Sequence, residues 1–178
     1  SIIGSEDLNA NSDVQAGFMN DIAVDPVDGI AYATDLYTGK VIKLEPQGSR
    51  YSVTVMATVV ASVLLLGGPG LNGPNGIALL PNGEESATHA IVAMYSEYRA
   101  YSAINLVDLS DGSSKELTVK PSWFSIGNDG IIFDDECEFL FVINNGAGSV
   151  SAYYSCDGFT ETMTLARVFK CGCEGKPG

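Results

Sequence analysis

The sequence has few positive charges: nine Lys and Arg stand against 22 Asp and Glu, which gives a formal net charge of −13 at pH 7. Proteins that bind nucleic acid or anionic membranes draw their affinity from clustered cations, so this deficit argues against both kinds of partner. Histidine is equally scarce, and one His with four Cys gives weak support for a zinc site, which needs about four ligands. The charge balance is instead compatible with cation binding and with an extracellular or secreted location.

Long apolar runs and helical periodicity are also missing. The most apolar stretch, 53–66, is interrupted by hydroxyl side chains and is shorter than the ~18 residues of a membrane-spanning helix. Its β-branched residues, followed by Gly-Gly-Pro, predict a buried strand. No basic and apolar leader opens the sequence, so we expect a secretory signal to be absent or already removed. With 20 glycines and 17% charged residues, the composition favours a turn-rich β protein.

What the sequence does contain is an internal repeat. The segments 20–26, 75–81 and 128–134 align, and their central residues Asp21, Gly76 and Gly130 recur after 55 and 54 residues. Each segment is followed by short β-type stretches separated by turns that contain glycine. Four-stranded antiparallel units at this period are typical of β-propeller blades. The sequence therefore predicts an all-β propeller domain over 1–178, with blades at approximately 18–66, 73–120 and 127–170.

Three blades are fewer than a closed propeller contains, since closed propellers have roughly four to eight. Open sheet edges and faces would remain at both ends of such an arc. We therefore expect further blades in a longer chain, or self-association of several copies, to complete the ring.

The cysteines suggest one specific pairing. If a hairpin turns around Gly146, Phe141 pairs with Ala152 and Cys137 lies opposite Cys156, within reach of a cross-strand disulfide. A bridge and two free thiols are equally compatible with this register. Cys171 and Cys173 lie two residues apart, point the same way on a strand, and have no assignable partner.

Polar residues recur where each repeat begins. These are Asn20, Asn75 and Asp129, each of which directly precedes one of the aligned residues Asp21, Gly76 and Gly130. This position is the entry to the strand that lines the channel of a propeller. Three side-chain oxygens at equivalent positions would converge on the axis, and such hard ligands suit calcium or magnesium better than zinc or copper. The alternative is structural, because Asn-Gly and Asp-Gly are common turn dipeptides.

The motifs at 18–25, 74–83 and 128–134 resemble successive blade starts of the senescence marker protein (regucalcin) and gluconolactonase family. The resemblance implies a six-bladed propeller with one divalent metal, usually calcium, on its axis. By motif position, Asn20, Asn75 and Asp129 resemble three of that family's metal ligands. In an active member, the metal would assist hydrolysis of a small-molecule lactone or ester, with Asp129 as ligand and candidate general base.

A second function stays open beside hydrolysis. Related propellers share the scaffold with other activities or with none, so a non-catalytic extracellular propeller that serves as a binding or assembly module is the alternative. The sequence does not decide whether the protein is an enzyme. His89 is expected to be a solvated or hydrogen-bonded residue at the edge of a strand rather than a catalytic one.

Overall fold

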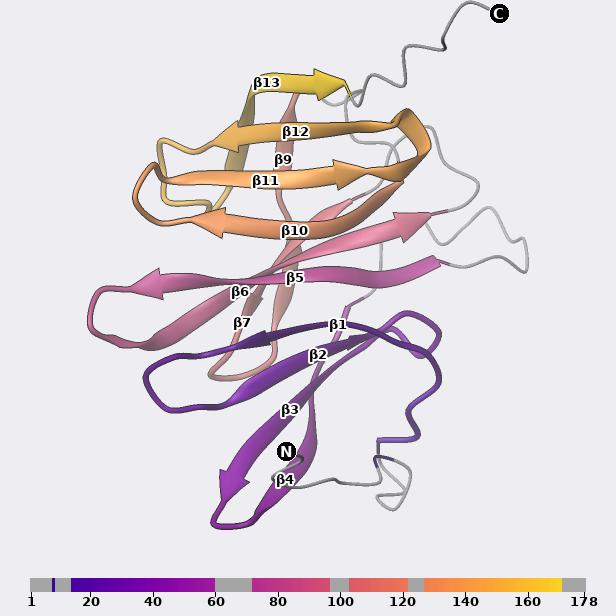
Figure 1. Cartoon of the computed structure of the whole chain (residues 1–178), viewed down its shortest axis with the longest axis vertical. Coiled ribbons are helices and arrows are strands. Elements are labelled where there is room, and N and C mark those ends of the chain that lie inside the picture. Colours follow the sequence, from indigo (N-terminus) through magenta and orange to yellow (C-terminus); the bar gives the residue numbers. More distant parts are fainter. Residues whose placement is uncertain (1–7, 9–13, 60–71, 97–102, 122–126, 171–178) are drawn as a thin grey trace, which may run out of the picture.

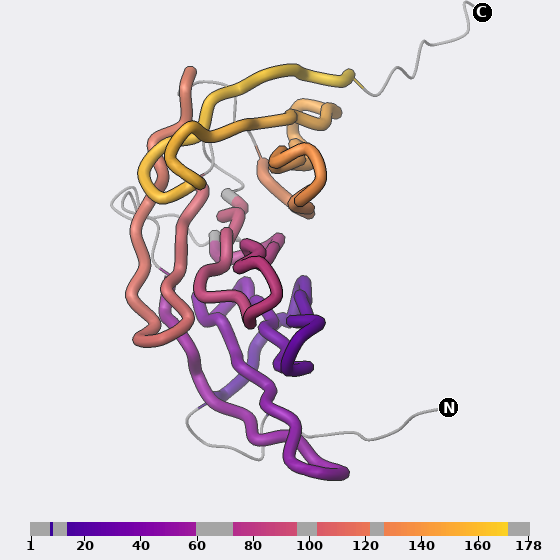
Figure 2. The backbone as a smooth tube through the Cα atoms, turned by 90° about the vertical axis from the view of Figure 1, so that its left-hand side faces the viewer, coloured from indigo at the N-terminus to yellow at the C-terminus, as the bar shows by residue number. Residues whose placement is uncertain are grey.

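The computed structural model describes residue 8 and residues 14–59, 72–96, 103–121 and 127–170. These residues form three sheets that follow one another along the chain (Figure 1). In the side view of Figure 2 the tube runs from the first sheet at the bottom to the third at the top. Within the described part of the chain, no helix has the length and hydropathy that crossing a membrane requires.

Sheet 1 is an antiparallel meander of four strands in chain order. Its strands are β1 (Met19–Val24), β2 (Ala31–Asp35), β3 (Lys40–Gln47) and β4 (Arg50–Thr58). The hairpin between β1 and β2 turns at Gly29, whose φ of 74° belongs to the left-handed region that glycine adopts without strain. The second half of the apolar stretch predicted as strand, from residue 60 on, lies outside the described residues.

Sheet 2 repeats this order with β5 (Asn72–Asn82), β6 (Glu85–Ser96), β7 (Ile104–Asp108) and β8 (Ser114–Glu116). Sheet 3 contains β10 (Asn128–Asp134), β11 (Phe139–Asn144), β12 (Ser149–Tyr154) and β13 (Thr162–Lys170), and the 3-10 turn η2 (Asn145–Ala147) joins β11 to β12. The predicted pairing of Phe141 with Ala152 is confirmed.

One strand leaves the expected pattern. The stretch that continues sheet 2 was expected to form a single fourth strand, but it divides at Leu117. Residues before Leu117 pair with β7, whereas β9 (Thr118–Lys120) pairs in parallel with β13 at the outer edge of sheet 3. The division follows from burial of Leu117, which is 2% exposed and belongs to the core between sheets 2 and 3.

The hydrophobic core lies between the sheets. One cluster fills the space between sheets 1 and 2, and a second fills the space between sheets 2 and 3. Strand β6 serves both, because Ile91 faces sheet 3 while its neighbours Ala90 and Val92 face sheet 1. Side chains that alternate between the two faces of β6 therefore connect the three sheets into one stack.

A buried carboxylate fixes the entry to sheet 1. Asp35, at the end of β2, is fully buried, and its oxygens accept the backbone N–H groups of Gly17 at 2.5 Å, Phe18 at 2.9 Å, Tyr37 at 3.1 Å and Thr38 at 3.3 Å. Burial alone would raise the pKa of Asp35, but these donors outweigh it and hold that pKa below its ordinary value.

Both central cysteines are exposed and free in this structure. Cys137 lies in the turn between β10 and β11, and Cys156 follows β12. The bridge between them stays a prediction. Cys171 and Cys173 lie outside the described residues.

Candidate functional site

The first strands of the three sheets share an irregularity at the position singled out by the repeat. In β1, β5 and β10 the register with the second strand shifts by one residue. The shifts enclose Asn20–Asp21, Asn75–Gly76 and Asp129–Gly130, which lie within strands and not in turns. Such β-bulges re-aim side chains and are enriched beside functional sites. Each predicted ligand therefore occupies a bulge.

Close contacts between neighbouring sheets hold these three bulges next to one another. A Cβ atom on Gly76 would lie 2.2 Å from the carbonyl oxygen of Asp129, so β5 approaches β10 there as only glycine permits. On the other side, the Asp21 carboxylate accepts the Ile77 N–H at 3.0 Å. The Thr34 hydroxyl donates to the Asn75 carbonyl oxygen, which adds a second tie between sheets 1 and 2.

The three predicted ligand side chains differ in their surroundings. Asn20 is exposed, Asn75 is 5% exposed, and Asp129 is half-buried. The side-chain oxygen of Asn75 has no hydrogen-bond partner, which is costly for a buried amide. Asp129 accepts a hydrogen bond from the side-chain amide of Asn145, in η2. The structure thus brings the backbones of the three bulges together and leaves one side-chain oxygen buried and unsatisfied.

Asn145 is the site residue that sequence reasoning missed. It stands in η2, in the hairpin between β11 and β12, and an Asn-Asn-Gly sequence by itself indicates only a turn. Its backbone N–H donates to the Gly127 carbonyl oxygen at 3.0 Å, which folds the hairpin back over the start of β10. The amide oxygen of Asn145 is a further hard donor beside Asp129.

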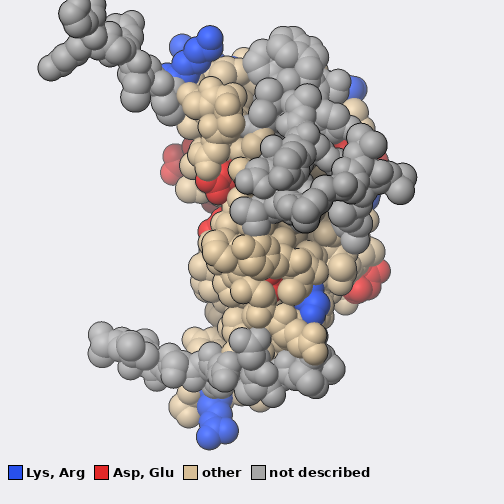
Figure 3. Space-filling model, turned by 90° about the vertical axis from the view of Figure 1, so that its right-hand side faces the viewer, with Lys and Arg blue, Asp and Glu red and all other residues tan. Residues whose placement is uncertain are grey.

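A groove of about 550 Å³ runs along the remainder of the three inner strands. Its walls come from the segments 21–27, 77–83 and 131–133, together with Glu85, Ala87 and Asp135. No Lys, Arg or His lines it, whereas four carboxylates do: Asp21, Asp25, Glu85 and Asp135. The predicted ligands are not among the lining residues, so they lie beyond the groove, at the end where the inner strands begin. Seen from the right-hand side of Figure 1, the described residues carry scattered rather than clustered charges (Figure 3).

Two of the groove carboxylates serve the fold. Asp21 accepts the N–H groups of Ile22 and Ile77, and the 2% exposed Asp25 accepts those of Val27 at 2.8 Å and Ala87 at 2.6 Å. Each residue thus satisfies one donor in sheet 1 and one in sheet 2. Over the described ranges, no three His, Cys, Asp or Glu side chains are grouped closely enough to hold a metal ion. Any cation at the bulges therefore depends on amide oxygens.

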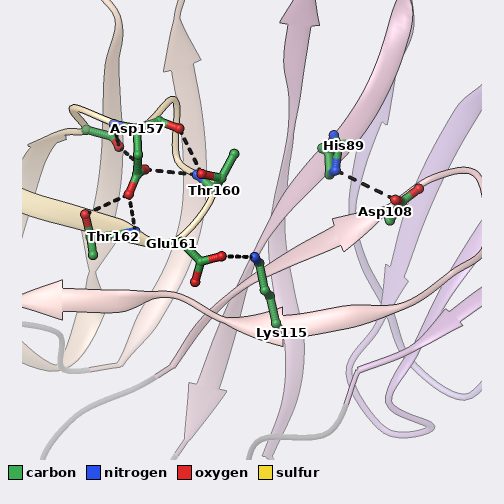
Figure 4. A network of polar contacts seen from close by, with 8 residues as sticks. His89, Asp108, Lys115, Asp157, Thr160, Glu161 and Thr162 are labelled. Atoms are coloured by element: carbon green, nitrogen blue, oxygen red, sulfur yellow. Dashed lines mark hydrogen bonds and ion pairs between the residues drawn. The ribbon is translucent and has the colours of Figure 1, made fainter.

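A separate polar network lies on the outer side of sheets 2 and 3 (Figure 4). His89 on β6 faces Asp108, with 3.8 Å between its Nε2 and the carboxylate, and its Nδ1 lies 3.0 Å from the Thr88 hydroxyl. The Asp157 carboxylate accepts the Ser155 hydroxyl at 2.6 Å, which is the main reason that the pKa of Asp157 is lowered to about 2. His89 is hydrogen-bonded, as expected, but it lies inside β6, paired with Leu80 and Asp108, and not at the edge of a strand.

Comparison with known proteins places the fold but no family. No protein-family model matches the sequence, and no curated protein matches it. Among solved structures, the chain is similar to one in a nidogen/laminin complex, with a TM-score of 0.59, 17% identity, 89% of this chain covered and 51% of that chain. It is also similar to a luciferin-regenerating enzyme, with a TM-score of 0.53, 12% identity, 85% of this chain covered and 46% of that one.

These similarities show a fold of the β-propeller type, in agreement with the all-β expectation. The chain spans about half the length of each structure that it matches. One neighbour is named as an enzyme and the other belongs to a nidogen/laminin complex, and a shared fold does not by itself fix a function.

Proposed function

We propose that the protein is an extracellular propeller that binds one calcium ion at the bulges of its inner strands and hydrolyses a lactone or ester there. The observation that carries the proposal is the buried Asn75 oxygen without a partner, at a bulge that all three repeats share. An amide oxygen held in this way loses its hydration without compensation unless a cation or a donor meets it.

The donor atoms available at the bulges are of the type that calcium prefers. Asn20, Asn75, Asp129 and Asn145 offer only oxygen, with one carboxylate among them. Calcium takes six to eight oxygen ligands, so water or further oxygen donors have to complete the coordination. Magnesium is the less suitable ion because it demands a smaller and more regular octahedron.

The chemistry divides between the ion and the chain. When bound, the cation would polarise the carbonyl group of a lactone or ester. Asp129 would bind the cation and, as candidate base, accept a proton from the attacking water through a carboxylate oxygen. Asn145 would orient that carboxylate through the hydrogen bond it already donates. The acidic groove beside the bulges favours neutral over anionic substrates, because no cation lines it.

Calorimetric titration of the chelator-treated chain with CaCl₂ tests the metal site. Asn75→Ala should abolish the binding heat. Asn105→Ala is the matched control, because Asn105 is 3% exposed and also has an unpaired side-chain nitrogen, but it stands in β7, two strands across sheet 2 from the bulge in β5. No calcium heat in the wild-type chain, or equal loss in both variants, would refute the site.

Hydrolysis is tested separately on aliphatic lactones and aryl esters. Turnover should require calcium and should fall by about 10²-fold or more in Asp129→Asn if that carboxylate acts as base. Calcium binding without turnover favours the second candidate, a non-catalytic binding module. The observation behind that alternative is the likeness to a chain from a complex with a partner protein.

A further inference from the structure

The groove along the inner strands collects most of the exposed aliphatic surface of the described residues. Of the five large aliphatic side chains that are exposed there, four line this groove: Ile22, Val24, Val27 and Ile132. Exposed apolar side chains that are scattered singly need no explanation, whereas a group of them in one concave place marks a binding surface. The concentration in the groove therefore asks for an occupant.

The exposure arises at the edge of each sheet beside the groove. Ile22 is 56% exposed, whereas Ala33 and Ile42, which follow it in the same register row across sheet 1, are 5% and 0% exposed. In sheet 3, Ile132 is 65% exposed, whereas Ala152 in the same row is 4% exposed. In both rows the uncovered residue is the one on the first strand, so it is the groove that leaves these side chains open.

Two carboxylates at one end of the groove have no cationic partner among the described residues. Glu85 begins β6 after the turn that ends β5, and Asp135 follows β10. Strands β5 and β10 end on the same side of the molecule, so both turns lie at one end of the groove (Figure 1). Within the described ranges, Glu85 accepts only the side-chain amide of Asn82, at 3.4 Å, and Asp135 accepts no hydrogen bond.

Aliphatic walls with two unpaired carboxylates select an occupant by its charge. A metal ion does not fit, because the acidic side chains of the described residues are not grouped closely enough to hold one. An anion would be repelled, and a neutral apolar molecule would leave both carboxylates without a counter-charge. An organic cation meets both demands, since its apolar part covers the aliphatic walls while its charge faces the acidic end. The volume of about 550 Å³ is in the range of small-molecule sites.

We propose that the groove binds an organic monocation, a protonated or quaternary amine that carries an aliphatic chain. The chain lies along Ile22, Val24 and Ile132, and the ammonium group lies at the end formed by Glu85 and Asp135. None of the predicted calcium ligands lines the groove, so this site depends neither on the proposed calcium ion nor on hydrolysis.

Calorimetric titration of the full chain with alkyltrimethylammonium chlorides tests the site. A calcium chelator in the buffer keeps the result independent of the bulges. The butyl, hexyl and octyl compounds should bind progressively more tightly, by about 15-fold for each two methylene groups, because each added group is taken out of water. Octanoate, which carries a similar chain with the opposite charge, should not bind. Octan-1-ol should bind more weakly than octyltrimethylammonium.

Single charge removals separate the groove from the net charge of −13, which attracts every cation. Glu85→Gln and Asp135→Asn should each weaken the binding of octyltrimethylammonium about two- to fivefold at low salt, as expected for one exposed ion pair. Glu84→Gln and Glu136→Gln are the matched controls. Each removes the same charge from the adjacent exposed residue outside the groove, so the dissociation constant should stay nearly unchanged.

The aliphatic wall has a variant and a control of its own. Ile132→Asn should weaken the binding of all three alkyl cations, whereas Ile143→Asn, at an exposed position of the same sheet outside the groove, should not. Circular dichroism checks that each variant is folded. No binding by calorimetry and by ligand-observed NMR would overturn the proposal. Octanoate or octan-1-ol that binds as tightly as the cation, or equal losses in the groove variants and their controls, would overturn it as well.

Discussion

Replacing Asp35 with asparagine removes one charge and changes one buried acceptor into a donor. The carboxylate accepts four backbone N–H groups, three through Oδ1 and the Gly17 N–H through Oδ2. In Asp35→Asn, the amide oxygen can keep the three donors at Oδ1, but the NH₂ group then meets the Gly17 N–H. Hydrogen bonds to a charged group contribute about 1.5–3 kcal/mol, so we expect a loss of that size in the free energy of unfolding.

The loss has a defined pH dependence. The pKa of Asp35 is lowered in the folded state, so its stabilising effect is complete above the unfolded pKa, near 3.8, and is lost as the pH falls through the folded value. The difference between wild type and Asp35→Asn should therefore be full at pH 7 and should shrink below about pH 4.

Urea unfolding followed by far-ultraviolet circular dichroism measures both effects, and the thermal midpoint should fall by about 3–12 °C at pH 7. Asp28→Asn is the control, because the exposed Asp28 carboxylate accepts a single N–H group, that of Ile30. A loss in Asp35→Asn no larger than in this control, or one that is the same at pH 7 and pH 2.5, would refute the reasoning.

Two further outcomes follow from contacts described above. Gly76→Ala should lower the free energy of unfolding in urea by about 1–3 kcal/mol, because its Cβ would meet the Asp129 carbonyl oxygen. Gly130→Ala is the control and should cost far less, because its Cβ would meet only an Ile143 methyl group at 3.3 Å. Equal costs in the two variants would contradict this. Carbon-13 NMR titration should find the pKa of Asp157 at about 2 and raised in Ser155→Ala, and an unmoved pKa would exclude the hydroxyl as its cause.

The repeat was the part of the fold that the sequence predicted well. Alternating apolar residues and glycine turns are local signals, and they led to the propeller expectation and to the pairing of Phe141 with Ala152. The bulges were less visible. Asn75–Gly76 was weighed as a turn dipeptide, but the close approach of β10 places that glycine inside a strand. Only the tertiary contact distinguishes the two interpretations.

Long-range pairings escaped the sequence for the same reason. Nothing local distinguishes Thr118–Lys120 from the strand before it, since its partner Thr162–Thr164 is distant in the chain. The Asn145 contact with Asp129 likewise joins a hairpin to a strand that begins 17 residues earlier. The candidate ligands could be named from motif and repeat, but their burial and hydrogen bonds could not.

The parallel pairing of β9 with β13 has a consequence for synthesis. Thr118 leaves the ribosome 44 residues before its partner Thr162. At about 5–20 residues per second, β9 waits roughly 2–9 s for that partner, with its edge unpaired. During this interval a nascent chain ending within sheet 3 exposes a template for intermolecular strand addition. Synthesis of β13 therefore ends a period in which the unpaired edge of β9 favours aggregation. A propeller whose strands pair strictly in chain order would not have this period.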